Sequence, residues 1–386
     1  MLVRMLAAAL LLIVAACAAR RPLPSTGGPW FELAGEFNIP PLTPFAPLEP
    51  ARFGGVSGLA IDPRPGPTEN DLLGISDDRD AARLFVFKVE GTGAAFKVDL
   101  RAYLPLPHAS GMPAGSDAEG IAVSRSGRVY VASEGVQTGE PRVPPSITVY
   151  DRRAEYLGSL PVPDRFVPPD RGPMGRGVRN NAGFESLTLS PDERHLFTAT
   201  ELPLLQDGEP PSFEHGALVR ILEYEAEGDS FRPSRQFAYP LDPLAKPAFP
   251  PGFAINGAVE LLALGGRDLL VLERCFVREA GAGGSSLTRI RIYRASLAGA
   301  TEISRVESLG RRRVRPARKT LLLDLADVKG LSPELAQLDN FEGMAFGPPL
   351  PDGSRTLLLV SDDNFSALQR TSFLLFRILR PLAPQP

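Results

Sequence analysis

The sequence predicts an all-β protein, and within that class a β-propeller of four-stranded blades around one axis. Three observations support this. A strand-turn-strand unit with an acidic open end recurs five times along the 386 residues. In the first strand of each unit large apolar residues alternate with mostly small ones, which is the two-residue period of a β-strand. The chain also contains 40 Pro and 37 Gly, which break helices and favour turns.

The five units are expected to be the inner hairpins of the blades. Each has turn-forming residues at its midpoint, a coincidence that unrelated loops would not repeat five times. The hairpins are expected from Ser57 to Asp78, Glu119 to Glu134, Glu185 to Glu201, Glu260 to Arg274, and Glu342 to Asp362.

Two further strands are expected between successive hairpins. They fall at 83–89 and 95–102, 146–150 and 156–160, 217–224 and 235–239, and 288–295 and 320–325. After the fifth hairpin only Ser372–Leu379 remains, so Trp30–Ile39 is expected to pair with it and close the ring. This gives five blades, or six if a long connecting segment contains another. Two stacked β-sandwiches are the alternative, but they would not predict matched hairpins.

The N-terminus predicts export. A short basic region precedes the apolar run Met5–Ala16, which is too short to span a membrane. Val14–Cys17 reads as a lipobox, so residues 1–17 are expected to be a signal peptide with a lipid on Cys17, 18–29 a tether and 30–386 the propeller. The periplasmic side of the outer membrane is the expected location. With an ordinary signal peptide, the protein would be periplasmic or secreted.

Composition excludes several classes of function. The formal charge of −3 gives no basic field for nucleic acid, and we expect no nucleic-acid partner. The protein is expected to be a monomer attached to the membrane only by the lipid. Without Cys17, Cys275 stands alone, so no disulfide supports the fold. The sequence has no G-x-S-x-G elbow, no H-E-x-x-H and no P-loop.

The open ends of the hairpins are where chemistry is expected. A hairpin returns its last residue to the first, so in a propeller these ends converge around the channel. Many carboxylates at one mouth must hold protons, meet arginines or bind a cation, and oxygen ligands favour Ca²⁺. A structural interpretation stays open, in which the acids accept backbone N–H bonds and lock the blades together. The expected acids are Asp77, Asp78, Glu119, Glu134, Glu185, Glu201, Glu260, Glu273, Glu342, Asp362 and Asp363.

Four segments resemble a known family. Asn180–Leu187, Leu269–Arg274, Asp339–Phe346 and Val360–Ser366 are similar to the phytase-like domain proteins, described as having esterase-like activity of phytase. The resemblance covers roughly Phe53–Leu379. It implies a secreted or periplasmic propeller that hydrolyses phosphoesters or other esters.

The resulting hypothesis is a hydrolase of small anionic phosphate esters that uses a divalent cation. The expected catalytic residues are Glu342, Glu185, Glu119 and Glu260, with Glu342 also a ligand. The other expected cation ligands are Asp362, Asp363, Asp77, Asp78, Glu134, Glu201 and Glu273. Arg274, Arg79, Arg179 and Asn364 are expected to bind the substrate. The alternative is a non-catalytic envelope binding propeller with structural calcium.

Overall fold

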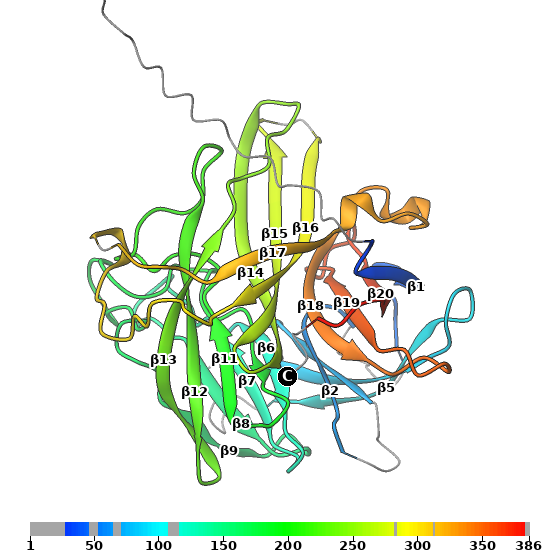
Figure 1. Ribbon diagram of the computed structural model, residues 1–386, viewed down its shortest axis with the longest axis horizontal. Coiled ribbons are helices and arrows are strands. Elements are labelled where there is room, and N and C mark those ends of the chain that lie inside the picture. The colour runs from blue at the N-terminus through cyan, green and yellow to red at the C-terminus, as the bar shows by residue number, and fades with distance from the viewer. Residues whose placement is uncertain are drawn as a thin grey trace, which may run out of the picture.

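A computed structural model describes residues 28–45, 53–64, 71–106, 116–281, 284–311 and 313–382. Five four-stranded antiparallel sheets radiate as blades from a common centre (Figure 1). The predicted five-bladed propeller is therefore confirmed, and the six-bladed and sandwich alternatives are wrong. Cys17 and most of the expected tether lie outside the described residues.

Blades are numbered here in chain order, each beginning at its inner strand. Blade 1 comprises β2 (Val56–Ile61), β3 (Leu72–Ser76), β4 (Arg83–Glu90) and β5 (Lys97–Pro105). Blade 2 comprises β6 (Ala118–Val123), β7 (Val129–Ser133), β8 (Ser146–Tyr150) and β9 (Tyr156–Leu160). Blade 3 comprises β10 (Thr188–Leu189), β11 (His195–Ala199), β12 (Ala217–Glu227) and β13 (Ser230–Leu241).

Blade 4 comprises β14 (Pro251–Gly265), β15 (Asp268–Glu279), β16 (Ser286–Ser296) and β17 (Arg318–Asp324). Blade 5 comprises β18 (Asn340–Gly347), β19 (Thr356–Asp362), β20 (Thr371–Ile378) and β1 (Phe31–Ile39). Short 3₁₀ helices occur at Leu309–Arg311, Leu325–Asp327 and Pro333–Leu335. No helix of the described residues is long and apolar enough to cross a membrane.

The ring closes by pairing the two ends of the propeller domain, as predicted. β1 runs antiparallel to β20, from Phe31 opposite Ile378 to Ile39 opposite Thr371. The N-terminal strand thus covers the edge of β20, which would otherwise expose unpaired backbone groups to other chains.

The hydrophobic core lies between the blades. Val360 of blade 5 packs in one cluster with Phe85 and Phe87 of blade 1, whereas the preceding residue, Leu359, packs in a cluster with Leu272 of blade 4. Successive side chains of a strand point to opposite faces of its sheet. Each strand therefore alternates between the previous and the next blade, and this alternation decides which polar residues reach the channel.

A β-bulge marks the inner strand near its open end. The unpaired residues are Ser57, Glu119 and Glu342 in blades 1, 2 and 5, whereas in blade 4 the register shift leaves Val259 unpaired. Bulges redirect side chains and often lie beside active sites. In the predicted repeat, Glu260 opens the fourth hairpin and corresponds to Glu119 and Glu342. The blade 4 bulge comes one residue earlier, at Val259.

Two inner hairpins differ in length from the prediction. The inner strand of blade 3 is only Thr188–Leu189, although a bridge between Phe184 and Thr200 continues the pairing. In blade 4 the hairpin extends far beyond Glu260, because β14 begins at Pro251. Glu260 is therefore within a strand and not at an open end.

Candidate functional site

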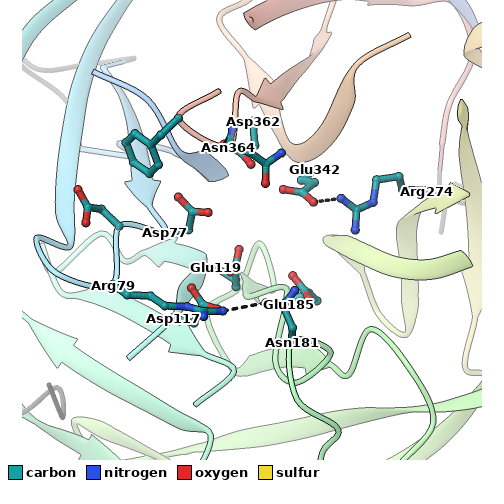
Figure 2. Close-up of a pocket in the computed structure, with 12 residues that line it drawn as sticks. Asp77, Arg79, Asp117, Glu119, Asn181, Glu185, Arg274, Glu342, Asp362 and Asn364 are labelled. Carbon is teal, nitrogen blue, oxygen red and sulfur yellow. Dashed lines mark hydrogen bonds and ion pairs between the residues drawn. The ribbon is translucent and has the colours of Figure 1, made fainter. Parts of the chain in front are cut away.

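A pocket of about 350 Å³ lies where the inner hairpins open (Figure 2). The carboxyl and guanidinium groups labelled in Figure 2 point toward one another from separate blades. Seven of the twelve lining residues in the described part of the chain are acidic and two are arginines, so carboxylates outnumber guanidinium groups there. The lining residues are Asp77, Asp78, Arg79, Asp117, Glu119, Asn181, Glu185, Arg274, Glu342, Asp362, Asn364 and Phe365.

Every blade places one residue in or beside this pocket, from its second strand or from the one or two residues that follow it. Each such residue lies two positions after a buried residue that packs toward the next blade, as Asp362 follows Val360 and Arg274 follows Leu272. Blade 4 therefore supplies an arginine where the other blades supply an acid. The five equivalent residues are Asp77, Glu134, Glu201, Arg274 and Asp362.

Glu273 does not belong to the pocket, contrary to expectation. It lies on the opposite face of β15 from Arg274, toward blade 3, because neighbouring strand residues alternate. The Tyr239 hydroxyl donates to it at 2.7 Å and the Lys319 ammonium lies 2.5 Å away. Burial raises the pKa of Glu273, and Lys319 opposes that shift. Its partners make it part of the contact between blades 3 and 4.

Glu260 is also displaced from its expected role. Its carboxylate accepts the N–H of Leu261 at 2.9 Å and bonds the backbone at Leu187 and Met344, which lie in blades 3 and 5. Burial nevertheless raises the pKa of Glu260 well above its usual value. Glu260 thus links three inner strands within the channel and does not line the acidic pocket. Its role is structural, because it accepts backbone N–H bonds and locks neighbouring blades together.

Two groups of carboxylates in the pocket wall share Glu134. Within each group, ligand oxygens lie within 4.8 Å of one another; the groups are Asp117, Glu119 and Glu134, and Glu134, Glu185 and Glu201. One Glu134 oxygen accepts the Gly183 N–H at 3.1 Å, and its carboxyl group also hydrogen-bonds that of Glu185. Two carboxyl groups can make this contact only if a proton or a cation lies between them.

Burial is the main cause of the pKa shifts in this wall. It raises the pKa of Glu134 to about 8, with Asp117 and Glu201 adding to the effect. Burial and the neighbouring Glu134 raise the pKa of Glu185 well above its usual value. Burial, together with the charges of Asp117 and Glu134, also raises the pKa of Glu119 well above its usual value. The wall therefore binds protons more tightly than carboxylates in water do.

The opposite wall is formed by Asp77 and Asp362. Burial raises the pKa of both Asp77 and Asp362, and the nearby negative charge of Glu342 raises it further. Asp362 accepts the N–H of Asn364 at 2.9 Å. A buried Asp77 oxygen has no hydrogen-bond partner among the described residues.

Two arginines balance part of the negative charge. Arg274 contacts Glu342 and Asn340 and lies 3.0 Å from Glu201. Although burial opposes its charge, Glu342 and Glu201 raise the pKa of Arg274. Arg79 donates to Asp117, and at 2.7 Å to Asn181. Both arginines bridge blades at the mouth of the pocket.

The model of the phytase-like family, described as "Esterase-like activity of phytase", matches residues 51–365. The chain belongs to this family. An uncharacterized secreted protein of Arthroderma benhamiae is 24% identical to this phytase-like chain over 204 residues, covering 46% of the chain and 37% of the relative. The chain thus matches little more than a third of that relative's length.

Solved structures similar to the phytase-like chain include two enzymes that act on sugars. One is a member of the GH130 family of mannoside phosphorylases and glycoside hydrolases, with 12% identity, coverage of 94% of this chain and 98% of that chain, and a TM-score of 0.42. The other is an α-L-arabinanase of Penicillium chrysogenum, with 10% identity, coverage of 91% and 99%, and a TM-score of 0.41.

Three further expected residues of the phytase-like chain lie at or beside the pocket. Asp363 accepts the N–H groups of Gly55 at 2.9 Å and Phe365 at 3.0 Å, so it fixes the backbone beside the pocket. Asp78 lines the edge, where it pairs with Arg83 at 2.8 Å. Asn364 lines the pocket as expected, and its φ of 48° is in the left-handed region, which Asn tolerates better than most residues.

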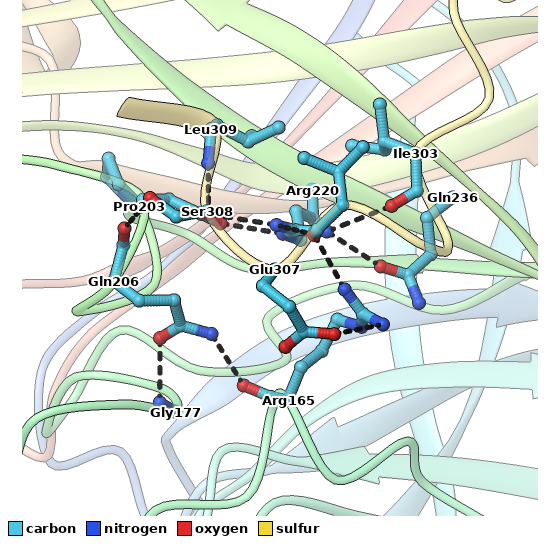
Figure 3. Close-up of polar contacts among 12 residues, drawn as sticks. Arg165, Gly177, Pro203, Gln206, Arg220, Gln236, Ile303, Glu307, Ser308 and Leu309 are labelled. Atoms are coloured by element: carbon cyan, nitrogen blue, oxygen red, sulfur yellow. Dashed lines mark hydrogen bonds and ion pairs between the residues drawn. The ribbon is translucent and has the colours of Figure 1, made fainter. Parts of the chain in front are cut away.

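Arg179 does not reach the pocket, and that expectation is wrong. It donates to the carbonyls of Pro203 at 3.0 Å and Gly208 at 2.8 Å. These bonds fasten the long loop 161–183. The same loop is held by Gln206, which bonds both Gly177 and Arg165 at 2.9 Å (Figure 3).

A buried ion pair anchors this loop region. Arg220 binds both oxygens of Asp207, at 2.6 and 2.9 Å, and both side chains are fully buried. Arg220 also donates to the Val306 carbonyl at 2.8 Å, which holds the loop before β17 against blade 3. Arg165 of the Pro- and Gly-rich loop donates to the same Val306 carbonyl at 2.6 Å, which ties the loop to this cluster.

Sequence reasoning missed three pocket residues. Asp117 lies two positions before Glu119, a spacing that could have indicated it. Asn181 lies in a segment that carries the family resemblance. Phe365, with a φ of 50°, gave no signal in the sequence, because its approach to the pocket depends on the strained backbone after β19.

Proposed function

We propose that this phytase-like protein is an exported hydrolase of small phosphate esters that uses a divalent cation in its acidic pocket. The excess of carboxylates over guanidinium groups carries this proposal. Seven acidic residues line the pocket, and Glu134 and Glu201 lie behind them, against Arg79 and Arg274. Additional positive charge must enter before most of these carboxylates can ionise together.

The donor set fits a hard cation. All the candidate ligands are oxygen atoms, which suit Ca²⁺ or Mg²⁺ better than softer metals. The second Glu134 oxygen is buried and has no N–H donor among the described residues. Asp117, Glu119 and Glu134, whose oxygens lie within 4.8 Å of one another, are the residues that would hold the cation, and Glu185 beside them would keep its proton. When bound, a divalent cation supplies Lewis-acid polarisation of a phosphoryl oxygen.

The protein's own residues supply orientation and proton transfer. Arg79 and Arg274 lie on opposite sides of the pocket in Figure 2, where they can orient an anionic group between them. Glu342 and Asp362 are placed to bind and orient a hydroxyl group or water. Glu185, whose pKa is raised, can hold a proton and donate it to a leaving alcohol.

A hydrolysis assay with matched variants tests this proposal. Phosphomonoesters, phosphodiesters and carboxyl esters are offered with Ca²⁺, with Mg²⁺ and with a chelator. We expect turnover of phosphate esters that the chelator abolishes, and a loss of at least a hundredfold in Glu185→Gln. Glu273→Gln, a buried acid outside the pocket, should keep its activity per folded molecule. Turnover that survives in Glu185→Gln with a chelator present would overturn the proposal.

A non-catalytic binding propeller is the second candidate, and one observation favours it. The same carboxylates also fasten blades, since Glu134 binds the Gly183 N–H and Glu201 binds Arg274. In that function the cation is structural. Chelator would then lower the melting temperature while no ester in the panel is hydrolysed.

Export is supported by two observations. The N-terminus has the pattern of a signal peptide ending at Cys17, and the relative from Arthroderma benhamiae is described as secreted. We propose a lipid anchor on Cys17 that holds the protein at the periplasmic side of the outer membrane.

A further inference from the structure

We propose that the far end of the central channel is a second binding site, which takes the hydrocarbon chain of a medium-chain fatty acid. A cavity of about 260 Å³ lies there, at the turns of the inner hairpins and away from the acidic pocket. All five inner strands contribute to its lining, including Leu59, Ile121, Leu187, Leu261 and Met344. A concave apolar lining formed by rigid strands is typical of small-molecule sites.

The cavity is separated from the acidic pocket. Leu187, Leu261 and Met344 line it, and the backbone of all three is bonded to the Glu260 carboxylate. Glu260 therefore links the strands between the two ends of the channel. A ligand at the far end meets apolar side chains and not the pocket carboxylates.

Charge at the opening selects the ligand's head group. Among the described residues that line the cavity, the charged ones are Arg125, Arg355 and Glu193, an excess of one positive charge. The Arg355 guanidinium lies over the Phe346 ring, 4.5 Å from its centroid, and so borders the apolar surface directly. Arg125 donates to the Pro191 carbonyl at 2.7 Å and lies 3.8 Å from Glu193. Two guanidinium groups beside an apolar opening match a carboxylate with an alkyl chain.

The volume limits the length of the chain. At roughly 30 Å³ for a group the size of water, about nine such groups fill the cavity. A methylene group is of similar size, so a chain of about eight to ten carbons fits. Longer chains gain no further affinity, because their additional methylene groups stay in water.

Calorimetric titration of the full chain with hexanoate to dodecanoate, below their micelle concentrations, tests the proposal. Each added methylene should lower the Kd about fourfold until the cavity is full. The Kd should then level off at about ten carbons. The alcohol of equal length should bind about tenfold more weakly than the carboxylate. A Kd that does not depend on chain length, or equal binding of alcohol and carboxylate, would overturn it.

Variants separate the head-group site from the chain site. Arg125→Gln combined with Arg355→Gln should remove the preference for carboxylate and keep the dependence on chain length. The matched control is Arg267→Gln, in the turn of the fourth inner hairpin but outside the lining. It should change neither the preference for carboxylate nor the dependence of the Kd on chain length. Ala60→Phe, which fills part of the cavity, should shorten the optimal chain or abolish binding in protein that still melts cooperatively. Unchanged decanoate binding in either lining variant would contradict the proposal.

Discussion

The carboxyl groups of Glu134 and Glu185 hydrogen-bond each other across the boundary between blades 2 and 3. Two ionised carboxylates would repel, so a proton or a cation must lie between them. Protons and a cation thus compete for the same oxygens, and pH, cation binding and stability are coupled at this contact.

Stability without a cation should fall as pH rises from about 4.5 to about 8. Burial raises the pKa of Glu134 to about 8, whereas the unfolded value is near 4.5, so in this window the folded state binds more protons. The free energy of unfolding then decreases with pH, by at most about 1.4 kcal/mol per unit for each such carboxyl. Chemical unfolding in chelator from pH 4 to 9 measures the slope.

The matched variant for this test is Glu134→Gln, which should flatten the slope because it removes one titrating group. Added Ca²⁺ should restore stability mainly at the alkaline end, since cation binding needs ionised ligands. Stability that rises with pH in chelator would contradict the prediction.

Removing the positive charge of Arg274 should destabilise the fold. Arg274→Met leaves Glu201 and Glu342 without their buried partner, and breaking such a pair costs about 3–5 kcal/mol. The loss should be smaller at pH 5, where both carboxyls are more readily protonated because burial raises their pKa. Urea unfolding at pH 5 and 8 measures the difference. Arg179→Met, which loses only bonds to carbonyls outside the pocket, is the control, and an equal loss in both variants would refute the prediction.

Glu260 should be needed for stability and not for cation binding. Glu260→Ala removes the acceptor for backbone N–H groups in the buried channel, and each group without a partner costs about 1–3 kcal/mol. Glu260→Gln keeps one acceptor oxygen and should fall between Ala and wild type. The concentration of Ca²⁺ that half-protects against unfolding should be the same in all three proteins. A weakened cation dependence in Glu260→Ala would place Glu260 in the site after all.

Cys17 should determine membrane attachment. In a bacterial host, Cys17→Ser should move the protein from the membrane pellet to the soluble periplasmic fraction, because the lipid cannot be added. The propeller should fold equally well in both forms, since it begins after the tether. Fractionation followed by immunoblotting measures the distribution, and a variant that stays in the pellet would show that Cys17 is not the anchor.

The repeated architecture of this phytase-like protein follows from local features of its sequence. Alternating apolar residues and turn residues at each midpoint are local features, and they sufficed to predict five blades and the closing pair of β1 and β20. The acidic ends also converge as expected, because a hairpin must return to its starting edge.

Which side chains face the pocket depends instead on how the blades pack against one another. Regular alternation along β15 turns Arg274 to the pocket and Glu273 toward Lys319, and the β14 bulge at Val259 leaves Glu260 inside the strand. A shift of one residue reverses the face of a strand, and no local pattern reveals where the extra residue is accommodated. Asp117 and Phe365 reach the pocket, and Arg179 turns away from it, because of contacts between segments far apart in the chain. Such contacts form only when the blades pack.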